Sequence, residues 1–467
     1  MTATGFKLLF LALMGSGIPV AIAMAGASLI YVIASGTAPD FVVIHRMVNG
    51  IDSFPLLAVP FFIMAGNLMN SAGITNRIYN FALALVGWLK GGLGHVNVVG
   101  SVIFAGMSGT AIADAAGLGT IEIKAMQDHG YSTEFSVGVT AASATLGPII
   151  PPSLPFVIYG MFANVSVGAL FLAGILPGAI MAILMMLTVA FYAHKNGWGG
   201  DVVFNWARMG KALGELGVVI GFPTALWAAS EMGLNMHWVV PIGLAALFAL
   251  DRLLNFVAVL PIMTPVLLIG GMTTGIFTAT EGAIAACVWA LLLGFVWYRT
   301  LNWRMLVKVS MDTVETTSTV LFIVAAASIF GWMLTATRTT EMIAQWVLAF
   351  TNEPWMFLLL ANALMLFVGC FLEPTAAITI LVPILLPIVR HLGIDPVHFG
   401  LIMVLNLMIG LLHPPMGLVL FVLARVAKLS VERTTMAILP WLVPLLISLG
   451  LVTYIPQISL WLPRQFS

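Results

Sequence analysis

Charged side chains are scarce in this sequence. Only 8% of the 467 residues are Asp, Glu, Lys or Arg, whereas about 25% is usual for a soluble domain. The 18 basic residues equal the 18 acidic ones, so the chain has no excess positive charge with which to neutralise the phosphates of a nucleic acid. Apolar residues make up 61% of the chain, and its mean hydropathy is +1.09. These values exclude a soluble enzyme with a single anchor and predict a polytopic membrane protein.

Cysteine is nearly absent, and the common catalytic motifs are missing. Cys287 and Cys370 are the only two cysteines and both lie in apolar runs, which excludes a disulfide framework and a cysteine-rich metal site. The chain contains neither the H-E-x-x-H motif of metallohydrolases nor a Walker-type G-x-x-x-x-G-K-S/T loop. We therefore predict that the protein is not an enzyme, holds no resident cofactor and does not hydrolyse ATP.

Apolar runs long enough to cross a bilayer recur along the whole sequence. They lack the strict alternation of barrel strands, so we predict an all-α protein. The first run, Phe6 to Ile33, is too long for a signal-peptide core, and we expect it to be one retained span. The basic stretches 194–215 and 299–308 should both be cytoplasmic by the positive-inside rule.

Two apolar regions, 93–127 and 355–389, are too long for one span and are interrupted in the middle. The interruptions lie at Gly106–Thr110 and at Gly369–Thr375. Each flanking half has about 14–17 residues, fewer than the roughly 20 that a crossing helix needs. Two short helices that meet at a polar tip are typical of a re-entrant hairpin, because interrupted backbone is tolerated in a membrane only where protein or water covers it.

The two interrupted regions belong to an internal repeat. A shift of 263 residues superposes landmarks in the same order without a gap: Gly106 on Gly369, Gly130 on Gly393, Gly147 on Gly410, Pro151-Pro152 on Pro414-Pro415, and Ile175-Leu176-Pro177 on Ile438-Leu439-Pro440. Each half therefore has a hairpin followed by a helix broken at G-x-x-x-P-P, over 132–162 and 397–424. We predict a first repeat over 1–200, an amphipathic linker with a hydrophobic insertion over 201–252, and a second repeat over 253–467. We expect the repeats to be inverted.

Helix interruptions of this kind suit the binding of ions and carboxylates. Unwound backbone frees carbonyl oxygens for a hard cation such as sodium, and the N-terminus of a half-helix offers N–H groups to a carboxylate. Polar residues gather at the predicted breaks: Ser108, Thr110 and Asp114 in the first hairpin, Glu373 and Thr375 in the second, and Ser143, Thr145, Asn406 and His413 in the broken helices. The candidate substrate-binding residues are Asp114, Ser143, Thr145, Gly147 and Asn406.

Several of these residues have a second interpretation. Intramembrane carboxylates usually serve function, but Asp114 could instead pair with Thr110, four residues earlier. Glu373 could belong to an ion site or cap the second half-helix, where the helix dipole favours a negative charge. Asn406 could bind substrate or tie two helices together. For Glu281, at the start of an apolar run, we predict a capping role.

The sequence resembles the large membrane subunit of TRAP transporters, in the ion transporter superfamily. The likeness is carried by F-A-G-M-S-G-T-A-I-A-D-A-A-G-L-G (104–119), T-A-A-S-A-T-L-G-P-I-I-P-P-S-L-P (140–155), G-I-F-T-A-T-E (275–281) and the segment 394–417. It covers nearly the whole chain except about 200–252. The resemblance implies an elevator-type translocator, with scaffold and transport domain, in a bacterial inner (cytoplasmic) membrane. Such a translocator imports an organic acid with sodium, and works with a small four-helix membrane subunit and a periplasmic binding protein.

The resemblance also implies sodium sites at the hairpin tips and the facing broken helices. In this chain the corresponding positions are Ser108, Gly109, Thr110, Gly369, Glu373, Thr375, Gly410, His413 and Met416. The chain departs from the family pattern where His413 replaces a usual Thr, where Glu373 replaces an expected Asp, and in the segment 217–250, which looks like an insertion. A histidine titrates near neutral pH, so His413 is a candidate for a proton contribution.

Two other functions fit parts of the sequence. Gly106-Met107-Ser108-Gly109 matches the short G-x-S-G pattern of an intramembrane serine protease, which would need a histidine base beside the serine. An ion channel would need a continuous polar stripe, which the apolar runs do not show. Neither alternative explains the 263-residue repeat.

Overall fold

The computed structural model describes residues 2–36, 38–233, 235–273, 276–414 and 417–465. Within these ranges the secondary structure is helical, and β structure is limited to an isolated bridge between Lys90 and Gly200. The prediction of an all-helical, multi-span protein is confirmed. Six helical segments of the described part are long and apolar enough to cross a membrane: Phe54–Ser71, Val167–Asn196, Ala279–Trp297, Trp303–Ala336, Pro374–His391 and Val431–Tyr454.

The N-terminal region forms more helices than the sequence suggests. It contains α1 (Ala3–Gly15), α2 (Val20–Ser35), α3 (Phe41–Ile51), η1 (Phe54–Leu57), α4 (Ala58–Ser71) and α5 (Ile74–Val86). The expected single span from Phe6 to Ile33 is wrong, because α1 ends at Gly15 and α2 starts at Val20. Gly17 adopts a left-handed conformation with φ +83°, and Pro19 disfavours a helical conformation in the residue before it.

The first interrupted region folds into three helices, α6 (Gly92–Ser108), α7 (Ala111–Ala116) and α8 (Leu118–Asp128). Gly109 ends α6 with a left-handed φ of +63°, and the Thr110 hydroxyl caps α7 by accepting a hydrogen bond from the Ala113 N–H at 3.2 Å. The following helices are α9 (Thr133–Ala144), α10 (Leu154–Ala163) and α11 (Val167–Asn196). The backbone is therefore non-helical between Ala144 and Leu154, where the G-x-x-x-P-P sequence lies.

The middle of the chain is largely helical in its described part. It contains α12 (Trp206–Glu231), α13 (Met236–Leu254), α14 (Val259–Thr273), α15 (Ala279–Leu291) and the π-helical turn η2 (Leu292–Trp297). The segment 217–250 thus lies in α12 and α13. Glu281 forms a capping box with Thr278, accepting the Thr278 N–H at 2.8 Å, so its predicted capping role is confirmed.

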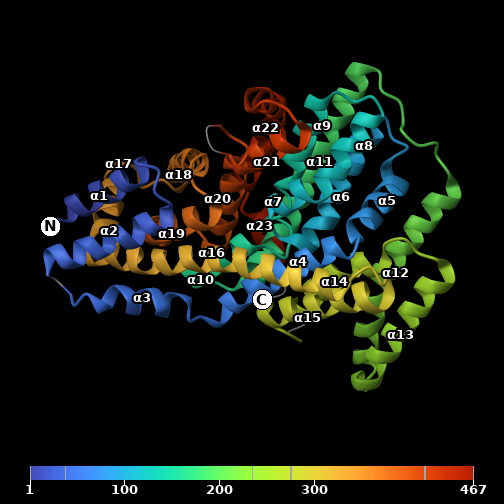
Figure 1. The fold of residues 1–467 in the computed structure, drawn as a ribbon, viewed down its shortest axis with the longest axis horizontal. Coiled ribbons are helices and arrows are strands. Elements are labelled where there is room, and N and C mark those ends of the chain that lie inside the picture. The colour runs from blue at the N-terminus through green and yellow to red at the C-terminus, as the bar shows by residue number, and fades with distance from the viewer. Residues whose placement is uncertain (1, 37, 234, 274–275, 415–416, 466–467) are drawn as a thin grey trace.

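The longest helix, α16 (Trp303–Ala336), extends along the long axis of the molecule and packs against α2, α3 and α4 (Figure 1). It is followed by α17 (Thr339–Phe350), α18 (Pro354–Gly369), α19 (Pro374–His391), α20 (Pro396–Gly410), α21 (Leu418–Ala427), α22 (Val431–Tyr454) and α23 (Gln457–Gln465). The backbone is interrupted again between Gly369 and Pro374, and between Gly410 and Leu418.

The segments around the four interruptions pack together in the centre of the molecule. α9 packs against α22, α10 against α19, and α7 against α21, so helices from both halves of the sequence share one core. In Figure 1, α7, α21 and α22 lie between α1–α3 at one end and α12–α13 at the other. The packing brings residues that are far apart in the sequence to the two hairpin tips.

Candidate functional site

The tip of the first hairpin lies against the interruption between α9 and α10. A β-carbon placed on Gly109 would lie 2.8 Å from the Pro152 carbonyl oxygen, and one placed on Gly147 would lie 3.0 Å from the Thr110 carbonyl oxygen. These approaches are between backbone atoms, so no side chain can move aside. Two non-helical stretches of main chain therefore meet here.

The second hairpin meets its own broken helix in a similar way. A β-carbon on Gly410, at the end of α20, would lie 2.6 Å from the Gly369 carbonyl carbon and 2.7 Å from its α-carbon. Gly369 is the last residue of α18. Only two glycines allow the two main chains to come this close. Packing alone therefore explains why both positions are glycine.

Glu373 is the N-cap of α19. Its Oε2 accepts the Ala376 N–H at 3.2 Å, and its Oε1 accepts a hydrogen bond from the Thr375 hydroxyl at 2.9 Å. The capping interpretation of Glu373 is thus confirmed. The carboxylate is partly exposed to two cavities, of about 400 Å³ and about 420 Å³, which lie on either side of the tip.

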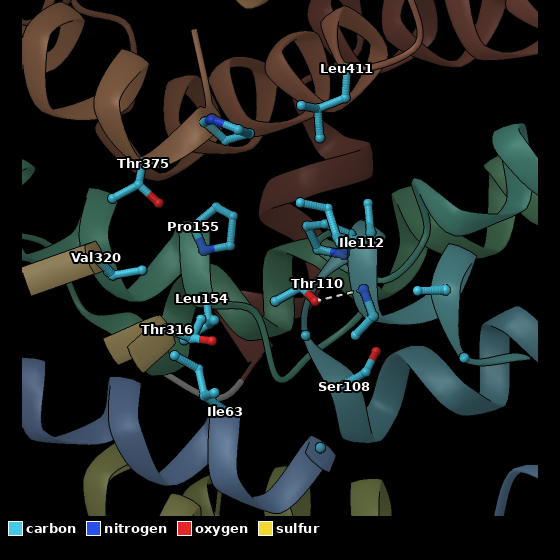
Figure 2. A pocket seen from close by; sticks show the side chains of 18 of the residues that line it. Ile63, Ser108, Thr110, Ile112, Leu154, Pro155, Thr316, Val320, Thr375 and Leu411 are labelled. Atoms are coloured by element: carbon cyan, nitrogen blue, oxygen red, sulfur yellow. Dashed lines mark hydrogen bonds between the residues drawn. The ribbon is translucent and has the colours of Figure 1, made fainter. Parts of the chain in front are cut away.

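The 400 Å³ cavity lies between the two hairpin tips. Figure 2 shows Ser108, Thr110, Thr316 and Thr375 around the same space. Its polar lining residues are Asn67, Asn70, Ser108, Thr110, Thr316, Glu373 and Thr375, and its apolar walls include Ile63, Leu154, Val320 and Leu411. Ser108 is 3% exposed and its hydroxyl has no hydrogen-bond partner in the described part of the chain. This cavity therefore combines a buried hydroxyl group without a partner in the described part of the chain, main chain from the helix interruptions and one carboxylate.

None of the five candidate substrate residues belongs to the lining of this cavity. Asp114 is 1% exposed, and the Ser143 hydroxyl donates to Asn97 Oδ1 at 2.6 Å. The Thr145 hydroxyl donates to the Ala142 carbonyl, and Asn406 donates to Asn362 Oδ1 at 2.7 Å, so it ties α20 to α18. The Asp114 backbone N–H, and not its carboxylate, bonds to Thr110. Gly147 contacts the hairpin tip beside the cavity.

The ring of His413 lies in the interruption after α20, where Nδ1 is 3.0 Å from the Ile409 carbonyl oxygen. This position keeps His413 beside the break without placing it in the lining of the 400 Å³ cavity. Pro414 follows in the same loop, while Pro415 and Met416 lie outside the described residues.

Asn67, Asn70 and Thr316 line the cavity but were not predicted from the sequence. Asn67 and Asn70 are three residues apart on α4, so both point to the same side of the helix. The spacing of these two asparagines within an apolar span is the sequence feature that could have identified them. Asn67 Nδ2 also lies 3.4 Å from the Thr313 hydroxyl, which links α4 to α16 beside the cavity.

Gly109→Ala is expected to destabilise the protein more than the same substitution at another glycine with a left-handed backbone conformation. The left-handed backbone costs an alanine roughly 1–2 kcal/mol, and the contact with Pro152 adds an overpacking cost of about 1–3 kcal/mol. Gly197→Ala is the matched control, since Gly197 has φ +67° but nothing within 4 Å of its β-carbon position. Thermal unfolding of the purified variants compares them, and equal losses would argue against a close approach at the tip.

Comparisons with known proteins agree with this architecture. The family model of the DctM component of tripartite ATP-independent periplasmic transporters matches residues 8–458, which include the segment 217–250. The sialic acid TRAP transporter large permease protein SiaM of Vibrio cholerae is 41% identical over 98% of this chain and 97% of its own length. The C4-dicarboxylate TRAP transporter large permease protein DctM of Rhodobacter capsulatus is 32% identical, with the same coverage.

A solved structure supports the fold alone. The YdaH transporter of Alcanivorax borkumensis has a TM-score of 0.60 at 16% identity, and the match covers 89% of this chain and 88% of that protein.

The serine protease alternative is wrong, since the Ser108 hydroxyl contacts no histidine in the described residues. The chain belongs to the DctM family, the large permease subunits of tripartite ATP-independent periplasmic transporters, and it is a transport protein and not an enzyme.

Proposed function

We propose that this chain is the translocating subunit of a sodium-coupled importer that carries an organic acid across a bacterial inner membrane. The observation that carries the proposal is the backbone contact at each hairpin tip, Gly109 with Pro152 and Gly369 with Gly410. The first contact joins two non-helical stretches and the second joins the ends of α18 and α20. Both bring main chain at a helix interruption into a hydrophobic interior, where carbonyl oxygens suit a hard cation.

The helix boundaries support a duplicated architecture. α9 starts at Thr133 and α20 at Pro396, which are 263 residues apart, and α8 and α19 end at Asp128 and His391, also 263 residues apart. We propose that α6–α10 and α18–α21 form a transport domain, and that α16 belongs to a scaffold with α2, α3 and α4, while its contact with α19 lies between the two domains. An elevator movement of this transport domain past the scaffold would carry both tips together.

We propose two sodium sites, one at each tip. The first uses Ser108, Gly109 and Thr110, and the unpaired Ser108 hydroxyl supports it. The second uses Gly369, Glu373, Thr375, Gly410 and His413, together with Met416. A carboxylate belongs only to the second set, so we expect that site to bind sodium more tightly.

The substrate would occupy the 400 Å³ cavity between the tips. The N-terminus of α7, whose residues line the cavity, favours a carboxylate there, whereas the start of α19 is already capped by the Glu373 carboxylate. Relatives are named for sialic acid, C4-dicarboxylates, isethionate and 2,3-diketo-L-gulonate, all of which carry an acidic group. We propose that Asp114, Ser143, Thr145, Gly147 and Asn406 contribute to this site from the surrounding helices.

The protein partners follow from the family. A large permease of this type implies a small membrane subunit and a periplasmic binding protein. This chain covers 65% of the isethionate permease DctMQ and 67% of the sialic acid permease SiaT, so those relatives carry additional sequence in one chain. We propose that a separate four-helix subunit takes the place of that sequence here.

Sodium replacement tests the proposal. Vesicles containing this chain, its small subunit and a substrate-loaded binding protein should take up a radiolabelled acid from the panel of sialic acid, C4-dicarboxylates, isethionate and 2,3-diketo-L-gulonate. Replacing sodium by choline should remove uptake, because the empty tip sites would leave carbonyl oxygens unpaired. Uptake at the full rate in choline would contradict sodium coupling.

A further inference from the structure

A second acidic group, Glu122 on α8, lies deep in the first hairpin. Its side chain is 1% exposed. Oε2 lies 2.6 Å from Asn97 Nδ2, which donates a hydrogen bond to it, whereas Oε1 is buried and has no partner within the described residues. Asn97 also contacts Thr140 and Ser143 of α9, so this carboxyl group belongs to a polar network between the hairpin and the broken helix.

In the part of the chain that the structure describes, no positive group compensates Glu122. The elements packed against α8 are α5, α6, α7 and α9, and their titratable groups are Arg77, Tyr79, His95, Asp114 and Glu134. Arg77 lies over the Tyr298 ring, and Glu134 faces Arg433. Among the described residues no Lys, Arg or His nitrogen comes within 4.0 Å of Glu122.

The groups that do act on Glu122 electrostatically are Asp114 and Tyr79, and neither can supply a positive charge. On α8 itself, Lys124 and Asp128 are exposed. An ionised Glu122 would therefore be a buried anion beside a second buried carboxyl group, without a counter-ion.

The helical arrangement does not itself require this carboxyl group. A shift of 263 residues places Glu122 on Leu385 in α19, Asn97 on Leu360 and Thr140 on Met403. Leu385 is buried, like Glu122. Of the network residues only Ser143 falls on a polar residue, Asn406, so the second half has no carboxyl group at the position of Glu122 and an apolar side chain in its place. The fold can therefore be built without a carboxyl group at this position.

We propose that Glu122 is a proton-binding site of the first hairpin. In the packed state its carboxyl group carries a proton on the unpaired Oε1, and Oε2 remains the acceptor for Asn97. When water reaches the hairpin, the carboxyl group becomes a carboxylate and the proton passes to that water. Because the proposed transport cycle moves this hairpin, uptake is then linked to pH as well as to sodium; this second consequence rests on the proposed function.

Infrared spectroscopy of the full chain in lipid nanodiscs tests the site directly. At neutral pH the protein should show the carbonyl stretch of a buried protonated carboxylic acid. Glu122→Gln should remove this component, while Glu281→Gln, which alters an exposed capping glutamate, should leave it unchanged. Labelling glutamate with ¹³C in the unsubstituted chain should shift the same component, which separates it from Asp114 even if the variant folds poorly. A carboxylic band that neither the substitution nor the label affects would overturn the proposal.

The pH profile of uptake tests the exchange of the proton. We compare vesicles with and without Glu122→Gln in a His413→Thr background, which removes the histidine beside the second tip. A pH-dependent rate that becomes flat with Glu122→Gln supports exchange, and an unchanged pH dependence overturns it. If no acid of the panel is taken up, the proposed function fails, whereas the infrared result still decides whether Glu122 holds a proton.

Discussion

Gly410→Ala should abolish sodium-dependent uptake and lower the stability of the protein by about 1–3 kcal/mol, the usual cost of overpacking a core. The added methyl group would lie 2.6–2.9 Å from the carbonyl carbon, α-carbon and oxygen of Gly369. These are main-chain atoms at the end of α18, so relief requires the whole hairpin tip to move away from the broken helix. Any ion site formed by both segments would then lose its geometry.

Gly450→Ala is the matched control for this change. Gly450 lies inside α22 and has nothing within 4 Å of its β-carbon position, so alanine there should stabilise the helix by roughly 0.5–1 kcal/mol. Uptake assays and thermal unfolding of both variants make the comparison. A Gly410→Ala protein with the uptake and the unfolding temperature of the Gly450→Ala protein would show that the two main chains do not need to touch.

Glu373→Ala should raise the sodium concentration for half-maximal uptake by about tenfold, which corresponds to ~1.4 kcal/mol of binding free energy. The substitution removes the only acidic side chain in the proposed second site. It also removes the cap of α19 and leaves the Thr375 hydroxyl without its acceptor. We expect the lost cap alone to cost about 0.5–2 kcal/mol of folding stability.

Ser430→Ala separates these two effects. Ser430 caps α22 by accepting the Arg433 N–H at 3.3 Å, and it lies outside both cavities at the second tip. The two variants should therefore lose similar stability, but only Glu373→Ala should change the sodium dependence. If both variants keep the half-maximal sodium concentration of the unsubstituted protein, Glu373 is a cap and not an ion ligand.

The helix interruptions were predictable because their causes are local. Gly109 and Gly17 take left-handed conformations, and proline restricts the residue before it, so these features act within a few residues of chain. Even so, Gly17 and Pro19 were read as part of one apolar span. Apolar character alone does not show whether a helix continues through a glycine and a proline, and the structure ends α1 there.

The residues of the candidate site were only partly predictable. Ser108, Thr110, Glu373 and Thr375 were named from their places at the breaks, and all four line one cavity. Asp114 and Asn406 were named by the same argument, yet they point into helix–helix contacts. A polar residue in an apolar helix signals burial, but its rotation about the helix axis, set by the neighbouring helices, decides whether it faces a cavity or a partner helix.

The sequence by itself determined that the chain spans a membrane, that it is helical and where its four central interruptions lie, because hydropathy and the chemistry of glycine and proline act along the chain. Only the tertiary structure decided that Asn67 on α4 and Thr316 on α16 share a cavity with the two hairpin tips. It also placed Gly369 against Gly410 and left Glu122 without a counter-charge. Such contacts depend on how helices distant in the sequence pack, and side-chain packing at that range leaves no periodic signal in one sequence.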